Sequence, residues 1–403
     1  MLEKPIAIQG ADVLTSIGWV KDTTVVIEEG KFVSIEPVTS PKGTILVDAR
    51  GLQMLPGIID VHGDAFERAI SPRPGITFPV PMAIAENDRN LLAAGITTFF
   101  YSITDSYEPG LRSRNTARQI IEFILEKGKQ SLRCDSRIHI RHEQANIEGH
   151  EELCDWLESG KIDLFSLNDH LPRKGDEEKL ARHMKSLRLR LKLSDAQMRA
   201  FVDQMQAARE QGTQQVEQLV ALAHQCGIPL ASHDDDTEEK VALSAKRRVA
   251  IAEFPATIEL AAKSRDYGAA VLMGAPNLVR GTSHVGWMSV AQAVENRVLD
   301  ALCSDYHYPS LFHAPFKLAQ LGLMAFEQAW ELVSLLPATA AGIGEKPTNK
   351  ENASRKGKIA VNWDADFLLI TPGNAFPSAI TAVHVAGQEV AHYPSSVTLR
   401  ELE

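Results

Sequence analysis

The sequence predicts an α/β protein built on a (β/α)₈ barrel of the TIM type, with a small β-sandwich formed by both chain ends. Three observations predict this architecture. From about residue 56 to residue 337, short apolar runs alternate with longer helical stretches, as in a parallel sheet. About eight such runs occur, the number that closes this barrel. At 403 residues, the chain exceeds the ~250 to 300 residues that a single core usually supports.

The two chain ends are expected to pair into one β domain, residues 1–55 together with 357–403. Short β-branched runs bounded by turn residues predict strands there, at residues 5–8, 24–27, 32–35, 367–370 and 382–386. This domain would flank a catalytic barrel over residues 56–356.

The barrel strands are predicted at residues 58–62, 96–101, 137–143, 162–167, 228–232, 249–254, 269–273 and 299–305. A doubly wound open sheet is the alternative. It would lead us to expect a glycine-rich turn after the first strand, where this chain has His62, Gly63 and Asp64.

A charged helical insert at about residues 171–210 interrupts the alternation after the fourth strand. Leu180, Met184, Leu187 and Leu191 form an apolar helical stripe, while another face carries Arg182, Lys185, Arg188 and Lys192. Two interpretations stay open: a solvated helix face, or a cationic lid over a polyanionic substrate.

Composition excludes several classes of protein. The chain has 42 Lys and Arg against 52 Asp and Glu, a net charge of −10, which is the wrong sign for a nucleic-acid binder. No apolar run approaches the ~18 to 20 residues of a membrane span, and no secretory leader begins the chain. Four scattered cysteines without C-x-x-C spacing argue against a disulfide framework. We expect a cytoplasmic enzyme with a small-molecule substrate and no nucleic-acid or membrane partner; a homo-oligomer stays open.

Polar side chains recur at the carboxyl ends of five predicted strands, where barrel enzymes place reactive groups. They are His62 and Asp64, Glu143, His170, His233 and Asp305. A lone histidine there is usually structural and a lone aspartate usually a helix cap, as we expect for Asp235 and Asp236. Recurrence at one rim instead favours a site for one or two divalent cations.

The residues also resemble a known superfamily. The segment LPGIIDVH, ending at His62, resembles the first metal-binding strand of the amidohydrolase superfamily, and residues 364–368 resemble its returning β strand. More specific blocks are HGDAFER at 62–68, SPRP at 71–74, SHDD at 232–235, AEFPAT at 252–257, MGAPNLVRG at 273–281 and CSDY at 303–306. Together they resemble the α-D-ribose 1-methylphosphonate 5-triphosphate diphosphatase family of the carbon-phosphorus lyase pathway, over nearly the whole chain.

The resemblance implies a hydrolase that releases pyrophosphate and leaves the 5-phosphate. It also implies a binuclear centre of zinc, manganese or magnesium, in which His62, Asp64 and Asp305 hold one ion. His170 and His233 would hold the second, and Glu143 would bridge; Asp305 would also act as the catalytic proton carrier. The H-x-D of this chain, in place of H-x-H, favours manganese or magnesium. The sixth strand carries Glu253 where a histidine ligand is usual, so its role stays open.

A triphosphate also needs positive partners, and guanidinium groups bind phosphate oxygens in pairs. The residues expected to bind substrate are Arg68, Arg73, Asn277, Arg280, Ser283 and His284. The alternative for the arginines is that they are ordinary surface charges. The alternatives for the whole protein are a superfamily deaminase or cyclic-amide hydrolase acting on a neutral ring, and a non-catalytic scaffold. The arginines count against the neutral ring, and the intact ligand positions count against the scaffold.

Overall fold

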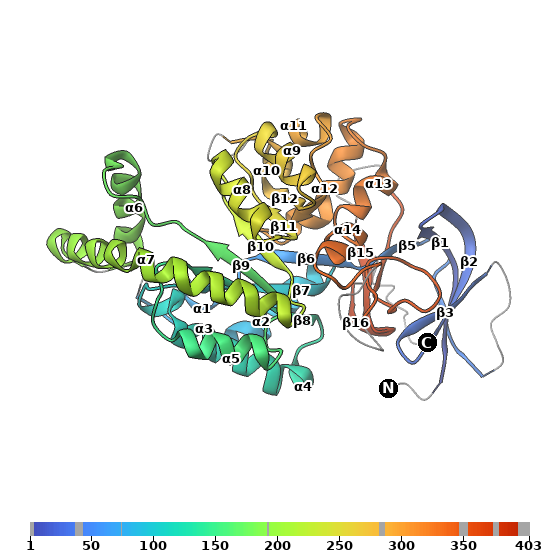
Figure 1. The fold of residues 1–403 in the computed structure, drawn as a ribbon. Coiled ribbons are helices and arrows are strands. Elements are labelled where there is room, and N and C mark those ends of the chain that lie inside the picture. Colours follow the sequence, from blue (N-terminus) through green and yellow to red (C-terminus); the bar gives the residue numbers. More distant parts are fainter. Residues whose placement is uncertain are drawn as a thin grey trace.

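The computed structural model describes residues 4–36, 43–73, 75–191, 193–281, 287–345, 354–373 and 379–393. Its centre is an eight-stranded parallel sheet in which neighbours in sequence are neighbours in space (Figure 1). The strands are β6 (Ile58–Gly63), β7 (Ile96–Asp105), β8 (Asp135–Glu143), β9 (Leu164–Asn168), β10 (Leu230–His233), β11 (Ile251–Glu253), β12 (Ala270–Gly274) and β13 (Ala301–Cys303). Each predicted strand overlaps one of them, so the predicted barrel is confirmed.

Backbone hydrogen bonds bring the first and last strands of this sheet together. The amide of Asp64 donates to the carbonyl of Asp305 at 2.9 Å, and the amide of Asp305 donates to the carbonyl of His62 at 3.0 Å. The carboxylate of Asp60 adds a bond from the Ser304 amide at 3.1 Å. These bonds hold the carboxyl ends of β6 and β13 side by side.

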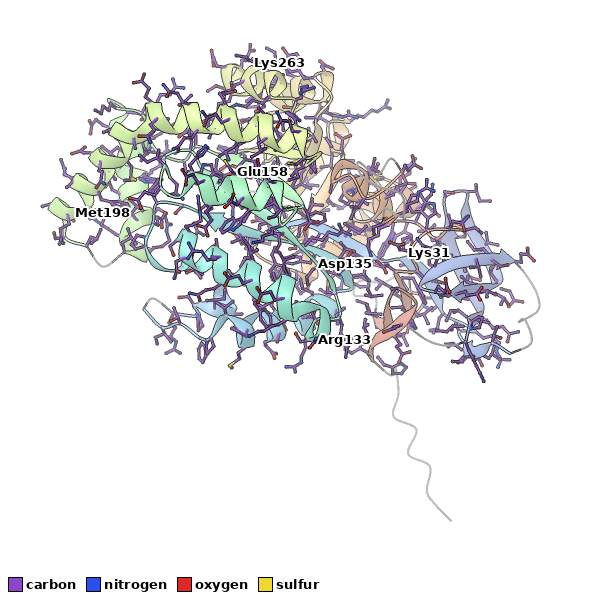
Figure 2. The ribbon with its side chains drawn as sticks, turned by 60° about the horizontal axis from the view of Figure 1, so that its bottom comes forward. Lys31, Arg133, Asp135, Glu158, Met198 and Lys263 are labelled. Carbon is purple, nitrogen blue, oxygen red and sulfur yellow. The ribbon has the colours of Figure 1, made fainter. Side chains whose placement is uncertain are left out.

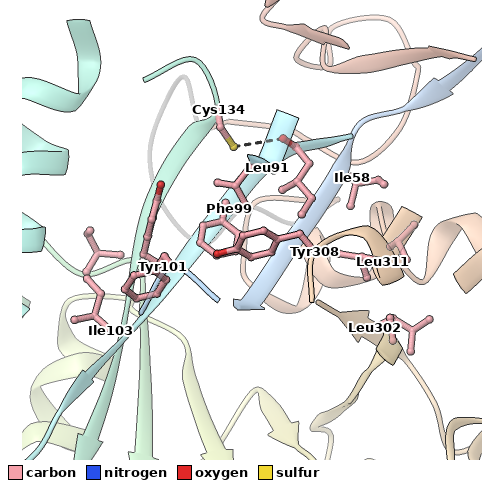
Figure 3. Packing of buried hydrophobic residues seen from close by; sticks show 14 of the residues in the cluster. Ile58, Leu91, Phe99, Tyr101, Ile103, Cys134, Leu302, Tyr308 and Leu311 are labelled. Carbon is pink, nitrogen blue, oxygen red and sulfur yellow. Dashed lines mark hydrogen bonds between the residues drawn. The ribbon is translucent and has the colours of Figure 1, made fainter. Parts of the chain in front are cut away.

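Alternation of side chains along each strand separates two apolar layers. Ile59, Val61 and Phe100 fill the inside of the barrel, whereas Phe99 and Tyr101 point outward to the helices. Figure 3 shows this outer layer, in which the Phe99 ring meets Tyr101 and Tyr308 edge to face at centroid distances of 4.7 and 5.4 Å. The inner and outer layers together bury both faces of the strands, which explains why the strands read as long apolar runs.

Helices cover the barrel. The longer ones are α2 (Val80–Ala93), α3 (Arg114–Glu122), α5 (His150–Glu158), α6 (Glu177–Arg190), α7 (Asp195–Gln225), α8 (Glu238–Lys246), α9 (Ile258–Asp266) and α12 (Pro309–Gln320). Shorter ones are α1 (Glu67–Ile70), η1 (Gly110–Arg112), η2 (Phe123–Gly128), α4 (Lys129–Ser131), α10 (Ala275–Arg280), α11 (Val290–Glu295), α13 (Phe326–Glu331) and α14 (Leu335–Ala340). Of these, α3, α6, α7, α8, α9 and α11 begin after a Ser, Thr or Asp whose side chain accepts a backbone N–H. Thr237 caps α8, so the expectation that Asp235 and Asp236 are its caps is wrong. Asp235 instead accepts hydrogen bonds from Ser232 and Ser244.

The insert forms helix α6 and the first part of α7, which project beyond the carboxyl ends of the barrel strands (Figure 1). Leu187 and Leu191 of the predicted stripe are buried against Met198 and Val202 of α7. Figure 2 labels Met198 at this end of the molecule and Lys31 at the opposite end. The two helices therefore share a small core, to which Ala145 and Leu171 of the loops after β8 and β9 also contribute.

Both chain ends form one mixed sheet, as predicted. Its order is β16 (Gln388–His392), β15 (Ile380–Val385), β14 (Phe367–Ile370), β5 (Gln53–Pro56), β1 (Ile6–Thr15), β2 (Gly18–Glu28) and β3 (Lys31–Glu36), with β4 (Ile45–Asp48) also paired to β1. Strand β14 joins the two ends, because it pairs antiparallel with β5 and β15. The boundaries at residues 55 and 357 stay a prediction.

Lys356 ties this sheet to the barrel. Its buried ammonium pairs with Asp366, just before β14, and lies 3.2 Å from Asp135 at the start of β8. The described helices include none that combines the length and apolar character of a membrane span.

Candidate metal centre and cavity

The barrel places imidazoles and carboxylates together at the carboxyl ends of its strands. Three residues there, Asp234, Phe254 and Asp305, have φ values of 56°, 58° and 52°, a left-handed conformation that non-glycine residues rarely adopt. Such strain clusters at functional sites, where the surrounding structure holds it in place.

An outer group consists of His170, His233 and Asp234, with Glu143 bonded to Nδ1 of His170. Oδ2 of Asp234 lies 3.6 Å from Nε2 of His170 and 3.4 Å from Nδ1 of His233. The two imidazole rings are 5.1 Å apart and nearly perpendicular. Nitrogen and oxygen donors this close together fit a divalent cation.

The electrostatics of the outer group favour positive charge. Burial alone would lower the pKa of His170, but Glu143 and Asp234 outweigh it and raise the pKa to about 10. Burial alone would raise the pKa of Glu143, yet the charge and hydrogen bond of His170 lower it to about 2. The same field that retains a proton attracts a metal ion.

An inner group consists of His62, His139 and Glu253, all buried. Nδ1 of His62 lies 2.9 Å from Oε1 of Glu253, and Nε2 of His139 lies 3.8 Å from the same oxygen. The other oxygen of Glu253 accepts a bond from Ser166 at 3.2 Å. The rings of His62 and His233 are 5.5 Å apart, so the inner and outer groups are neighbours.

Sequence reasoning missed His139 and Asp234 and left Glu253 open. The signal for His139 was available, because it has the same parity on β8 as Arg141 and Glu143 and so projects to the same side. The signal for Asp234 was its place directly after His233. The structure brings Glu253 into contact with His62, within one candidate metal-binding group.

The other two predicted ligands lie at the rim. Asp64 faces Arg141, with Oδ2 3.5 Å from Nη1, and belongs to neither group. Asp305 is held by its backbone next to His62, and its carboxylate packs beside Gly274, where an added Cβ would lie 3.4 Å from Oδ2. Asp305 belongs to neither group of the described residues.

Arg141 is a buried cation among these ligands. Its Nη2 lies 3.0 Å from Nε2 of His233, and its Nε is buried without a hydrogen-bond partner in the described structure. An arginine in this position offers a fixed positive charge to any anion that reaches the barrel mouth.

Two of the predicted substrate residues, Arg68 and Arg280, contact Tyr306. Arg68 donates to the carbonyl of Tyr306, and Nη1 of Arg280 lies 2.9 Å from its hydroxyl. Asn277 has a buried Oδ1 that lacks a hydrogen-bond partner in the part of the chain that the structure describes. Arg73 is exposed, and Ser283 and His284 fall outside the described residues.

A cavity of about 1450 Å³ opens over the outer group, with Arg141, Glu143, His170 and Asp234 at its base. Its other walls come from α6, from the loops after β7 and β10 and from the segment around Trp287. Arg68, Arg73, Asn277 and Arg280 are not among the described residues that line it.

The imidazoles and carboxylates at the strand ends of this (β/α)₈ barrel form a candidate metal site of the kind that hydrolases use. The chain has the fold of molinate hydrolase, with a TM-score of 0.62 and 14% identity over 99% of each chain. It also resembles a dihydropyrimidinase from Brevibacillus agri NCHU1002, with a TM-score of 0.55 and 16% identity over 96% of this chain and 95% of that one. No family model matches the sequence.

A curated relative gives the family. Over 309 residues, the sequence is 34% identical to the α-D-ribose 1-methylphosphonate 5-triphosphate diphosphatase of Escherichia coli (strain K12). The match covers 74% of this chain and 81% of the relative. The chain therefore belongs to the α-D-ribose 1-methylphosphonate 5-triphosphate diphosphatase family, and it is a hydrolase.

Proposed function

We propose that this hydrolase releases pyrophosphate from α-D-ribose 1-methylphosphonate 5-triphosphate, in the carbon-phosphorus lyase pathway of phosphonate catabolism. The observation that carries the proposal is the pair of neighbouring ligand groups at the barrel mouth of a chain from this family. The fold alone does not select this reaction, because structures with the same fold include an enzyme named for a pyrimidine substrate.

Two divalent cations are proposed to bind at the barrel mouth. One would be held by His170, His233 and Asp234, with Glu143 supporting His170, and the other by His62 and Glu253 with His139. The rim carboxylates Asp64 and Asp305 would complete the coordination. Bound divalent cations would offset charge on the phosphate oxygens and make a water molecule more acidic. The mixed donor set suits zinc, manganese or magnesium.

The protein's own groups then have defined tasks. Asp305 accepts a proton from the water that attacks the α-phosphorus, from a position that its backbone bonds to β6 hold. The new bond joins this water oxygen to the α-phosphorus, and the bond from that phosphorus to the bridging oxygen breaks, which releases pyrophosphate. Arg141 stabilises the charge that develops on the phosphoryl oxygens.

Arg68 and Arg280 are proposed to bind an anionic group of the substrate, together with Arg73, Asn277, Ser283 and His284. Arg68 donates to the carbonyl of Tyr306 and Arg280 to its hydroxyl, so both guanidinium groups are anchored to the residue that follows Asp305. Guanidinium groups fixed in this way lose little conformational freedom when a phosphate or phosphonate binds.

Phosphorus NMR of the metal-reconstituted protein tests the reaction. The substrates are ribose 1-methylphosphonate 5-triphosphate, ATP and a cyclic amide, each with and without prior metal removal. We expect metal-dependent release of pyrophosphate from the ribose phosphonate and a much slower reaction with ATP. Turnover of the cyclic amide alone would show that the phosphoryl chemistry is wrong.

A further inference from the structure

One face of helix α6 forms a polar wall of the cavity. Lys179, Arg182, His183, Ser186 and Arg190 all line it. Their spacing of three, four, seven and eleven residues from Lys179 places them on one side of a helix. We call these five residues the inner face of α6. The apolar stripe with Leu187 lies on a different side and packs against α7, so the packing of the insert presents the inner face to the cavity.

Contacts across the cavity hold the inner face close to the candidate metal centre. Nζ of Lys179 lies 3.1 Å from Asp236, two residues after Asp234 of the outer group. At the other end of α6, Arg190 makes two bonds of 2.8 Å to the buried carboxylate of Glu108, which follows β7. The helix is therefore fastened at both ends over the barrel mouth.

Charge is distributed unevenly around this cavity. The inner face contributes three cations and no carboxylate, whereas Asp234 and Asp236 follow β10 and Glu239 and Glu259 lie in the first turns of α8 and α9. Arg182 is paired only with exposed Glu178, at 3.3 Å, among the described residues. Surface pairs of this kind contribute little, so a phosphate can replace Glu178 at low cost.

His183 adds an independent sign of a ligand. Its Nε2 is buried and lacks a hydrogen-bond partner within the described ranges, although the side chain lines the cavity. A buried polar atom without a partner is unfavourable unless something binds to it. An anionic oxygen between Arg182 and His183 would provide that partner.

We infer that the inner face of α6 binds the β- and γ-phosphates of the substrate, the part that leaves as pyrophosphate. The inference rests on the proposed function and adds where the triphosphate lies. The reacting phosphorus is at the base of the cavity, and the leaving group extends toward α6. The arginines around Tyr306 are then available for the other anionic end of the substrate.

Inhibition by the two products distinguishes the binding sites for the two ends of the substrate. The metal-reconstituted protein is assayed with magnesium in excess, using pyrophosphate and ribose 1-methylphosphonate 5-phosphate as inhibitors. For Arg182→Ala we expect the inhibition constant of pyrophosphate to rise about tenfold or more, because a charge-assisted bond is lost. Inhibition by the 5-phosphate should stay within twofold of wild type. Arg182→Glu should enlarge the effect on pyrophosphate.

Lys185→Ala is the matched control, since it removes an exposed cation of α6 that does not line the cavity. Equal pyrophosphate inhibition of Arg182→Ala and Lys185→Ala would overturn the inference. A loss of pyrophosphate inhibition in Arg280→Ala alone would also overturn the inference. In either case, turnover of the substrate by the wild-type protein would leave the proposed function intact. If wild type does not turn over the substrate, calorimetry with magnesium pyrophosphate still decides: binding lost only in Arg182→Ala supports this anion site, and binding unchanged in it refutes the site.

Discussion

The two ring nitrogens of His139 have different surroundings. Nδ1 lies 3.0 Å from the carbonyl of Val61, so it carries the proton and donates. Nε2 is buried without a hydrogen-bond partner in the described structure and faces Glu253. Histidines that bind metals characteristically donate their second N–H to a carbonyl or carboxylate in this way.

We predict that His139→Gln loses one of the two proposed ions, because the substitution removes a ligand of the inner group. Metal content after dialysis, measured by inductively coupled plasma mass spectrometry, gives the ion number per chain. His384→Gln is the control, since His384 is equally buried but stacks on Phe367 in the mixed sheet. A full metal content in His139→Gln, with wild-type circular dichroism, would contradict the ligand role.

The role of Asp305 in proton transfer predicts a different result. Asp305→Asn keeps the shape and the backbone bonds to β6 but cannot accept a proton, so kcat should fall about 10²- to 10⁴-fold. Single-turnover kinetics at matched metal content measure the effect on chemistry directly. Wild-type turnover in this variant would remove Asp305 from the reaction.

At the scale of single elements, α6 depends on its contact with α7. Leu187 is fully buried among Leu191, Met198 and Val202, in a small cluster that is distinct from the barrel core and also includes Ala145 and Leu171 of the loops after β8 and β9. A core of this size leaves the helix sensitive to one side chain. The orientation of the inner face therefore rests on Leu187.

Leu187→Ala should weaken this packing by about 2 to 5 kcal/mol, the usual range for such a truncation. Because the cluster is distinct from the barrel core, we expect faster hydrogen exchange over residues 177–202 and unchanged protection of the barrel strands. Leu180→Ala, at a half-buried position of the same stripe, should have a smaller effect. Uniform loss of protection throughout the chain would show that the insert and barrel unfold together.

For the whole molecule, the join between the mixed sheet and the barrel depends on Lys356. Its ammonium is buried between Asp366 and Asp135, which belong to the sheet and the barrel respectively. Removing one member of a buried charged cluster leaves the others uncompensated. In the pair Lys31 and Asp364, by contrast, the lysine side chain is 46% exposed.

Lys356→Met should therefore lower the free energy of unfolding by about 3 to 5 kcal/mol. Lys31→Met is the control, for which about 0 to 1 kcal/mol is expected. Urea denaturation followed by tryptophan fluorescence measures both. Equal effects of the two substitutions would show that burial does not distinguish these ion pairs.

The same cluster predicts an acid dependence. Burial would raise the pKa of Asp135, but Lys356 and Arg137 outweigh it and lower the pKa from 3.8 to about 2. Because the folded pKa is below the ordinary value, the stabilisation from this group is complete above about pH 4 and is lost as the pH falls toward 2. In Asp135→Asn, the unfolding free energy should fall less between pH 4 and pH 2 than in wild type. An identical slope would contradict the assignment.

Much of the fold was predictable because it depends on local patterns. Runs of β-branched residues that alternate with helical segments located all eight barrel strands, and short strands at both ends indicated the shared sheet. Strand ends of a closed barrel share one rim, and there Glu143 bonds to His170, whose ring is 5.1 Å from that of His233. The roles assigned to these residues stay a prediction.

The sequence by itself determined the class of fold, the family and the rim at which the polar residues gather. Only the tertiary structure decided that Glu253 and His139 meet His62, that Asp64 turns to Arg141, and that α6 directs Lys179 and Arg182 over the barrel mouth. The physical reason is the separation along the sequence over which each interaction acts. Periodicity is set by neighbours along the chain, whereas the partner of a side chain at a strand end depends on strands and helices that are distant in sequence and are brought together only by packing.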